Sequence, residues 1–347
     1  MPTIRERLEA EEKRSLHPRA ALAQNARRER PEPEDELRTS FQRDRDRIIH
    51  SKSFRRLKGK TQVFLAPVGD HYRTRLTHTL EVSQVARTFA RALFLNESLV
   101  EAMVMGHDLG HTPFGHAGEA VLRKILPDGF HHVRQSVRVV EVLERDGQGL
   151  NLTAEVRDGI LRHTKGKGAV LMQGAGLKAL TLEAELVRIA DIVAYVCHDL
   201  DDAIRAGLVA EADVPEAIAK VIGRTHGQRL DAFVRDVVFH NDLEKADHIE
   251  MSEPVHGALL ALRDFLYERV YESQPVHSEF EKAEKILTEL YQYLLADEAR
   301  FTRDYWPRKR EGEPLQRAVV DFICGMTDRY AIELYEKIFV PQAWPLQ

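Results

Sequence analysis

Apolar residues recur every three to four positions along most of this chain, and that period constrains its fold more than any other feature. Between Leu76 and Leu93 they mark one face of a helix, and the same spacing returns repeatedly after Glu211. The period-two alternation that would predict strands is scarce. The sequence therefore predicts an all-α protein whose helices each bury one face.

Local signals set the expected helix ends. Asn96 can cap a helix that runs to Gly106, and Gly110, Pro113 and Gly115 then interrupt the pattern. Glycine-rich residues 165–176 are expected to form a loop. Further helices are predicted over 117–126, 132–145, 153–163 and 182–206.

Three regions are expected along the chain. Residues 1–40 combine a short charged amphipathic stretch with the proline- and glutamate-rich PEPEDE, which predicts a partly irregular arm or an oligomer contact. Residues 41–210 hold the densest motifs and are expected to form a catalytic core. Residues 211–347 are expected to form a C-terminal helical region packed on that core.

The composition is typical of a soluble globular protein, with 43% hydrophobic and 30% charged residues. No apolar run approaches the ~20 residues that a membrane helix needs, and the first residues lack the apolar segment of a secretory signal. We therefore expect a cytoplasmic protein. Cys197 and Cys324 lie far apart, which indicates neither a disulfide framework nor a thiolate zinc site.

Charge is unevenly distributed along the chain. The net charge of −5 argues against a protein whose main role is to coat nucleic acid. Between Arg43 and Arg75, however, ten lysines and arginines face three aspartates. This basic strip (43–75) suits a polyanionic ligand, or it is an ordinary solvated surface.

Histidines are concentrated in one part of the chain: eight of the sixteen lie between His71 and His163. A single histidine on a helix is usually a packing residue. A cluster of imidazoles and carboxylates is different, because neutral nitrogen and anionic oxygen are the ligands of a catalytic divalent metal and helices hold them rigidly.

The segment HDLGHTPFGHAGE, residues 107–119, carries the sharpest signal. His107 and Asp108 are adjacent, so both can reach one ion at a helix end, and His111 lies one turn further along. Beyond the proline, His116 and Glu119 are spaced to share a helix face, where a carboxylate can orient an imidazole for proton transfer.

The predicted helix 182–206 supplies a further carboxylate. Asp191, Tyr195 and Asp199 follow one another at intervals of four, beside apolar residues. A polar stripe on an apolar helix is paired, functional or a solvated face. With the histidines upstream, we interpret the metal ligands as His78, His107, Asp108 and Asp191.

The pattern H…HD…D of these four residues resembles the metal-binding signature of the HD phosphohydrolase superfamily. Segments across about 41–339 are similar to successive motifs of the bacterial deoxyguanosinetriphosphate triphosphohydrolase-like family. They are FRRLKGKTQVF, RLTHTLEV, HDLGHTPFGHAGE, LNLT, GILRHT, ADIVAYVCHDLDDAI and GMTDRYA. The resemblance implies an HD-domain helical bundle with a C-terminal helical extension, and hydrolysis of a deoxynucleoside triphosphate (dNTP) to deoxynucleoside and tripolyphosphate.

The same resemblance implies roles for individual residues. It implies a divalent metal, Mg or Mn first and Fe, Co or Ni as alternatives, on the four ligands. The resemblance makes His116 and Glu119 the catalytic pair. It also makes His111 a catalytic residue and places it near the phosphates. The expected substrate contacts are Arg75 and His132 at the phosphates, Gln62 and Asp199 at the sugar 3′-hydroxyl, Tyr195 against the deoxyribose, and Arg162, His163 and Arg329 with less defined roles.

The resemblance also implies a homo-oligomer, often a hexamer, that responds to an activating dNTP. Two alternatives stay open. One is an HD enzyme acting on another phosphate substrate, such as a cyclic nucleotide, a guanosine polyphosphate or a nucleotide monophosphate. The other is a non-catalytic binder of nucleotides or single-stranded nucleic acid that uses the basic strip. The residues Tyr195 and Asp199 favour a deoxysugar, and the pair His116 and Glu119 favours catalysis.

Overall fold

The computed structural model describes residues 1–62, 73–164, 178–307 and 309–341. Every regular element within these ranges is a helix, apart from two isolated β-bridges. The predicted all-α class is therefore confirmed. His71 of the histidine-rich region and the predicted loop over 165–176 lie outside the described residues.

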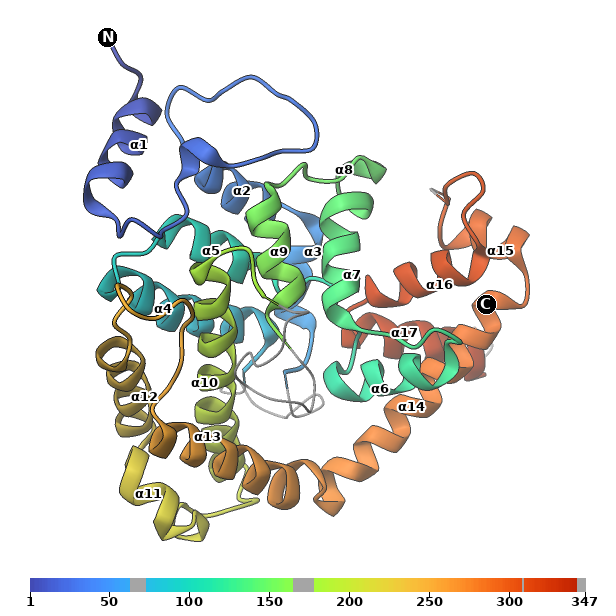
Figure 1. Ribbon diagram of the computed structural model, residues 1–347. Helices are drawn as coiled ribbons and strands as arrows, with labels where there is room; N and C mark the ends of the chain where they lie inside the picture. The colour runs from blue at the N-terminus through green and yellow to red at the C-terminus, as the bar shows by residue number, and fades with distance from the viewer. Residues whose placement is uncertain (63–72, 165–177, 308, 342–347) are drawn as a thin grey trace, which may run out of the picture.

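Figure 1 shows the helices in chain order, with a long connection between α1 and α2. Those of the N-terminal and central parts are α1 (Ile4–Ser15), α2 (Ser40–Ile49), α3 (Lys52–Arg56), α4 (Arg75–Ala92), α5 (Glu97–Gly106), α6 (Gly115–Ile125), α7 (His132–Arg138), α8 (Glu144–Gly147), α9 (Ala154–Arg162) and α10 (Leu182–Arg205). Those of the C-terminal part are α11 (Glu216–Ile222), α12 (His226–His240), α13 (Glu253–Leu266), α14 (Gln274–Leu295), α15 (Glu298–Asp304), α16 (Leu315–Cys324) and α17 (Asp328–Phe339). Within the described ranges, no helix combines the length and the apolar character needed to cross a membrane.

The helix starts follow from local capping. The side chain of Asn96 accepts a hydrogen bond from the Leu99 amide at 3.1 Å and begins α5, as predicted. Thr153 and Thr181 cap α9 and α10 in the same way. Each cap satisfies an amide that the first turn of a helix leaves without a partner.

The single helix predicted over 132–145 is wrong in its second half. After α7, residues Val139–Leu143 form a π-helical turn, and Arg145 and Asp146 adopt positive φ angles of 52° and 55°. The amide of Leu150 donates to the carbonyl of Val140 at 2.6 Å. The returning chain therefore takes over an acceptor that a continuous helix would have used.

Buried apolar side chains form two interiors. The first joins α4, α5, α9 and α10 with α12 and α13, and the second joins α6 with α14, α16 and α17. Figure 1 shows α6 beside α14, away from α4 and α5. Helix α6, which carries His116 and Glu119, thus belongs to one interior and the helices with the expected metal ligands belong to the other. The division into three regions stays a prediction.

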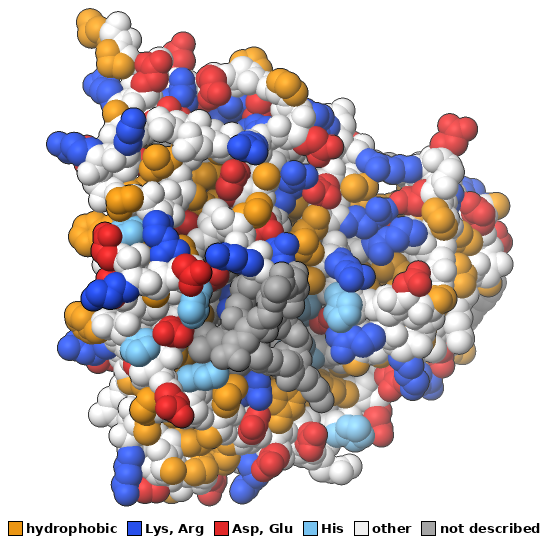
Figure 2. Space-filling model, viewed as in Figure 1, with side chains coloured by type: hydrophobic (Ala, Val, Ile, Leu, Met, Phe, Trp, Pro, Cys, Tyr) orange, Lys and Arg blue, Asp and Glu red, His pale blue; other side chains and the backbone are white. Residues whose placement is uncertain are grey.

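Charge pairs within the protein neutralise much of the basic strip (43–75). Arg43 and Arg47 approach Glu32 of the PEPEDE segment at 3.3 and 2.6 Å, and Arg73 approaches Glu81 at 2.9 Å. Figure 2 shows positive and negative side chains interspersed over the visible face. The strip is therefore not one continuous positive surface, which weakens the nucleic-acid alternative.

Lys60 belongs to this strip but is buried, with 2% of its surface exposed. Its ammonium group donates to the carbonyl oxygen of Cys324 at 2.6 Å and to that of His111, so it joins α16 to the histidine-rich segment. Burial lowers the pKa of Lys60 to about 8. The contact therefore links the two interiors through a lysine that loses its proton more easily than usual.

Replacing Lys60 tests this link through the pH dependence of stability. Between about pH 8 and the ordinary lysine pKa of about 10.4, the unfolded chain keeps the Lys60 proton and the folded chain releases it, so folding stability rises with pH. Lys60→Met removes that gain. The free energy of unfolding of the wild type minus that of the variant should increase by up to about 3 kcal/mol over this window. Denaturant titrations at each pH measure it, with exposed Lys58→Met as control; a constant difference would contradict the assignment.

Candidate metal centre

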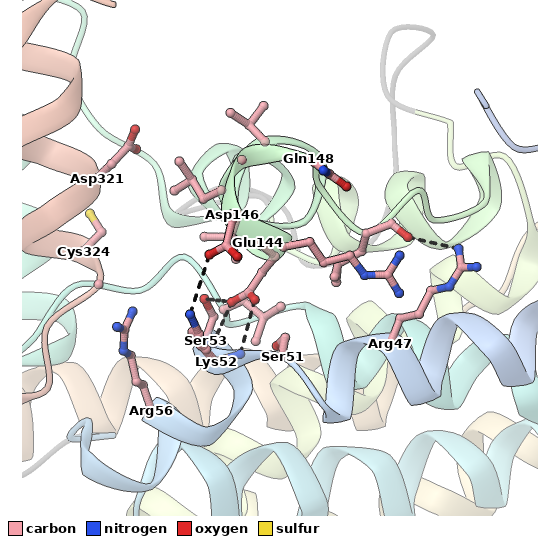
Figure 3. A pocket seen from close by; sticks show the side chains of 18 of the residues that line it. Arg47, Ser51, Lys52, Ser53, Arg56, Glu144, Asp146, Gln148, Asp321 and Cys324 are labelled. Carbon is pink, nitrogen blue, oxygen red and sulfur yellow. Dashed lines mark hydrogen bonds and ion pairs between the residues drawn. The ribbon is translucent and has the colours of Figure 1, made fainter. Parts of the chain in front are cut away.

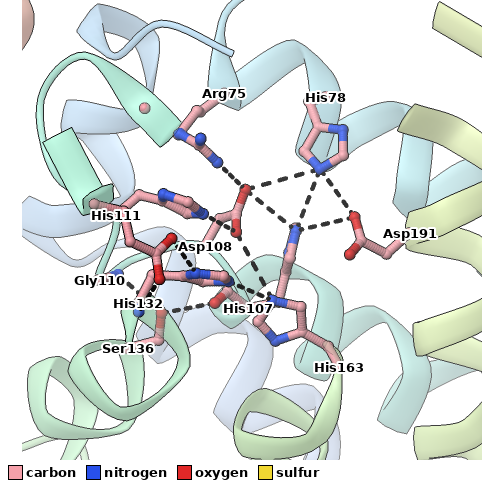
Figure 4. Close-up of polar contacts among 12 residues, drawn as sticks. Arg75, His78, His107, Asp108, Gly110, His111, His132, Ser136, His163 and Asp191 are labelled. Carbon is pink, nitrogen blue, oxygen red and sulfur yellow. Dashed lines mark hydrogen bonds and ion pairs between the residues drawn. The ribbon is translucent and has the colours of Figure 1, made fainter. Parts of the chain in front are cut away.

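Four side chains from three separated segments meet at one point (Figure 4). His78 projects from the first turn of α4, and His107 and Asp108 directly follow the end of α5. Asp191 lies in the middle of α10, which packs against both helices. The structure thus brings together the four residues that the sequence analysis interpreted as metal ligands.

The distances suit a shared cation. His78 Nε2 lies 3.2 Å from Asp191 Oδ1 and 3.4 Å from His107 Nε2. His107 Nε2 lies 3.4 Å from Asp108 Oδ2 and 3.8 Å from Asp191 Oδ1. Ligand atoms about 2.0–2.2 Å from one small cation are themselves about 3 Å or more apart. Two imidazole nitrogens and two carboxylate oxygens are also the donor types that a divalent cation takes.

Electrostatics make this point attractive to a cation. Burial alone would raise the pKa of both carboxyl groups. The surrounding imidazoles nevertheless hold the pKa of Asp191 below its ordinary range, and the imidazoles together with Arg75 hold that of Asp108 well below it. Arg75 donates to Asp108 Oδ2 at 2.6 Å. Two ionised carboxylates inside the protein thus face one fixed guanidinium, and a divalent cation would offset their remaining charge.

Two imidazoles are oriented by helix carbonyls. His107 Nδ1 lies 2.7 Å from the carbonyl oxygen of Val104, and His163 Nδ1 lies 2.8 Å from that of Ile160. A carbonyl only accepts, so each Nδ1 carries the proton and each Nε2 presents a lone pair. Burial, followed by the charges of His107 and His132, lowers the pKa of His163 to about 3, so it is neutral at pH 7. His163 therefore lies against the centre as a further possible ligand.

A second group of histidines adjoins the metal centre. His132 Nδ1 lies 2.9 Å from Glu119 Oε2, and its Nε2 lies 3.2 Å from His163 Nε2. The ring of His111 stacks on that of His132 with centroids 3.9 Å apart. Burial would raise the pKa of Glu119, but the hydrogen bond from His132 and the charges of nearby imidazoles lower it below the ordinary range. Glu119 is therefore an ionised carboxylate within a chain of imidazoles.

The predicted orientation of His116 by Glu119 is not what the geometry shows. Helix α6 begins at Gly115, so His116 stands in its first turn and is exposed, whereas Glu119 is buried. The carboxylate of Glu119 is instead engaged by His132 and, at 3.1 Å, by Arg123. A residue of α7, thirteen positions away, has replaced the neighbour that the helical spacing favoured.

Several buried polar atoms of the expected substrate contacts have no hydrogen-bond partner among the described residues. They are Gln62 Oε1, Arg75 Nε and Nη2, His111 Nδ1 and Asp199 Oδ1. Gly115 lies close to both Gln62 and Arg75. A Cβ atom on Gly115 would lie 3.2 Å from the backbone carbonyl oxygen of Gln62 and 3.3 Å from Arg75 Nη2. Unpaired buried polar atoms are costly, and a polar ligand would supply the missing partners.

Sequence reasoning missed two residues near Asp199. The hydroxyl group of Tyr271 donates to Asp199 Oδ2, and His198 lies between Asp199 and His78. His198 was visible as a histidine within the motif of α10. Tyr271 gave no signal, because it follows α13 and only the fold brings it to α10. Tyr195 is half-buried one turn before Asp199.

Two expected substrate contacts, Arg162 and Arg329, form ion pairs within their own helices. Arg162 pairs with Asp158, one turn earlier in α9, at 2.5 Å. Arg329 is exposed and pairs with Glu333 at 2.6 Å. Both guanidinium groups are thus engaged by carboxylates on their own helices.

Comparison with known proteins agrees with this site. Residues 75–196 match the model of the HD domain, and residues 249–337 match the model of the phosphohydrolase-associated domain. The first match contains all four converging residues. The second covers α13 to most of α17, a region that contains Tyr271 and three helices of the second interior, α14, α16 and α17.

Two relatives align over almost their whole length. Both are named deoxyguanosinetriphosphate triphosphohydrolase-like protein. The one from Desulfatibacillum aliphaticivorans is 51% identical over 346 residues, which covers 98% of this chain and 99% of the relative. The one from Caldanaerobacter subterraneus subsp. tengcongensis is 50% identical over 342 residues, covering 98% and 97%. A solved phosphohydrolase from Bacteroides thetaiotaomicron shares the fold, with a TM-score of 0.53, 15% identity and coverage of 89% of this chain and 71% of that chain.

The close approach of α7 at Gly110 yields a test of the site's construction. A Cβ on Gly110 would lie 2.1 Å from the Ser136 amide nitrogen and 2.7 Å from the His132 carbonyl oxygen. Gly110→Ala must therefore displace α7, and we expect a loss of at least about 2 kcal/mol in the free energy of unfolding. Gly257→Ala, in α13 with open space around it, is the matched control and should be neutral or stabilising. Equal stabilities of the two variants would contradict this packing.

Proposed function

This chain belongs to the deoxyguanosinetriphosphate triphosphohydrolase-like family of HD-domain proteins, and on that premise we propose that it hydrolyses dNTPs, dGTP among them, to deoxynucleoside and tripolyphosphate. Family membership makes it a hydrolase. The observation that carries the finer proposal is the convergence of His78, His107, Asp108 and Asp191 beside unpaired buried groups suited to phosphates and sugar. The names of its relatives support a nucleoside triphosphate as substrate.

We propose that the four converging residues hold Mg²⁺ or Mn²⁺, with Fe, Co or Ni as alternatives. The mixed nitrogen and oxygen donor set and the two ionised carboxylates support this assignment. When bound, such a cation polarises a phosphate oxygen and makes a coordinated water more acidic. Side chains of the protein would neutralise charge and transfer protons.

The neighbouring side chains manage charge and protons. Arg75 is fully buried with two free guanidinium nitrogens, and with His111 and His132 it would neutralise charge that develops on the phosphates. His116, exposed at the start of α6, would give a proton to the departing 5′-oxygen. The ionised Glu119, through His132, would keep the imidazoles beside it oriented for this transfer.

The sugar would lie between α10 and the segment before α4. Gln62 Oε1, buried without a partner in the described ranges, and Asp199 would read the 3′-hydroxyl. Tyr195 would pack against the deoxyribose. The hydroxyl group of Tyr271 donates to Asp199 Oδ2, and this contact supports a carboxylate that accepts from hydroxyl groups. His163 would contact the substrate or the cation, and the roles of Arg162 and Arg329 stay predictions.

We further propose that a second dNTP activates the enzyme within a homo-oligomer such as a hexamer. A separate cavity of about 910 Å³ supports this, and none of the clustered histidines lines it (Figure 3). Exposed Arg55 and Arg56 of the basic strip line it together with Arg145, Arg310 and Lys52, which lies 3.8 Å from Asp146. Their excess of positive charge suits a polyphosphate.

Product analysis tests the reaction. With Mg²⁺ or Mn²⁺ added, the protein should convert a dNTP, or an equimolar mixture of the four dNTPs, into deoxynucleoside and tripolyphosphate, as resolved by ion-exchange chromatography. Faster turnover in the mixture than with single dNTPs would support the activator. Pyrophosphate or orthophosphate as the product, or inertness toward every dNTP, would instead favour another HD phosphohydrolase reaction.

Two kinds of variant separate metal binding from proton transfer. Asp191→Ala removes a ligand and a charge, so metal content after dialysis, measured by inductively coupled plasma spectrometry, should fall. His116→Ala and Glu119→Ala should keep metal and fold but lose about 10²–10⁴-fold in turnover. Unchanged metal in the first variant, or wild-type turnover in either of the others, would remove the corresponding assignment.

A further inference from the structure

The second ring nitrogen of His78 faces a side chain to which no role has been given. His78 Nδ1 lies 2.8 Å from His198 Nε2, and the two rings meet edge-on at a centroid distance of 5.0 Å. His198 Nδ1 lies 2.7 Å from Asp199 Oδ1. All three side chains are buried, with exposed fractions of 2%, 1% and 2%. A line of polar groups thus runs from the metal centre to Asp199.

These distances determine where the protons lie. His198 Nδ1 and Asp199 Oδ1 are not aligned for a hydrogen bond, and neither atom has another partner among the described residues. At 2.7 Å, however, the negative carboxylate would repel a lone pair on His198 Nδ1 and attract an N–H group, so its charge favours the proton on this nitrogen. In the neutral ring, Nε2 is then an acceptor and takes the hydrogen bond that His78 Nδ1 donates. The Nε2 atom of His78 then has no proton and can give its lone pair to a cation that His107 and Asp191, at 3.4 and 3.2 Å from it, would share.

The position of His78 in its helix explains why this arrangement is needed. His107 and His163 each follow the last residue of a helix, where carbonyl groups are free to accept from Nδ1. His78 lies in the first turn of α4, where the free backbone groups are amides, which only donate. Among the described residues, the partner of His78 Nδ1 is accordingly a side chain, His198, and the carbonyls of Thr74 and Arg75 one turn earlier accept from the His78 amide and the Thr79 hydroxyl group.

We infer that His198 is a positioning residue that keeps the His78 proton on Nδ1 and the His78 lone pair on the cation, with Asp199 setting the tautomer of His198. This inference rests on the metal site of the proposed function. It also connects two parts of that function, because the carboxylate proposed to read the sugar sets the form of a metal ligand two side chains away.

Metal binding by the full chain without nucleotide tests the inference. Mn²⁺ affinity is measured by isothermal titration calorimetry and by the loss of the free Mn²⁺ electron paramagnetic resonance signal. His198→Phe keeps a ring but offers no acceptor, and its affinity should fall by about 10–100-fold. His198→Gln can accept from His78 and donate to Asp199, so it should recover most of that loss. The control is His226→Phe. His226, in α12, contacts the carbonyl of Cys197 in α10, the residue before His198, and this variant should bind Mn²⁺ like the wild type.

A double variant tests the path through His198. Asp199→Asn should also weaken Mn²⁺ binding, although Asp199 is not among the converging residues. Because its effect acts through His198, the combination with His198→Phe should bind no more weakly than His198→Phe alone. If His198→Phe fails to fold, His198→Gln and Asp199→Asn still report, since the first should bind nearly as wild type and the second more weakly.

Three results would overturn the inference: wild-type affinity in His198→Phe, equal losses in the Phe and Gln variants, or additive losses in the double variant. Failure of the proposed function looks different. A wild-type protein that binds Mn²⁺ but releases no tripolyphosphate would refute the reaction and leave the His198 comparison intact. A wild-type protein that binds no Mn²⁺ would refute both.

Discussion

Two ionised carboxylates held inside the protein are the constraint on which the rest of the site depends. Asp108 directly follows α5 and Asp191 lies in α10, and their charges lie within 4 Å of the same imidazole nitrogen. Such charges are tolerated in an interior only when partners surround them. Arg75 satisfies one oxygen of Asp108, and the imidazoles face the others. The crossing of α4, α5 and α10 is thus both the centre of the first interior and the place where a cation would be most stabilised.

The C-terminal helices complete the site rather than merely covering it. Asp328, at the start of α17, accepts the amides of Thr61 at 2.8 Å and Phe114 at 2.9 Å. These amides adjoin Gln62 and the start of α6, so one carboxylate fixes two segments that border the centre. Asp321 of α16 accepts from Gln135 of α7 at 2.8 Å. The side chains proposed for proton transfer are therefore positioned by a region that begins more than a hundred residues further along the chain.

Protons at this site are placed by the ends of helices. Residues that follow a helix, such as His107 and His163, find free carbonyl acceptors on that helix, whereas the free backbone groups at the start of a helix are amides. His78 Nδ1 instead meets the side chain of His198. The proposed metal ligand His78 and the proposed sugar contact Asp199 then lie along one line of polar groups, which would give a physical route by which a bound sugar affects a bound cation.

Much of this site could be predicted from the sequence by itself: the all-α class, the capped start of α5, and the candidate ligands His78, His107, Asp108 and Asp191. Helices and caps depend on residues within about four positions of one another, and the ligand types are recognisable by their chemistry. Only the tertiary structure decided that Glu119 contacts His132 instead of His116, that acidic residues neutralise most of the basic strip, and that His198 and Tyr271 join Asp199. These outcomes depend on side chains that the chain brings together from distant helices, and no spacing along the sequence records which of them meet.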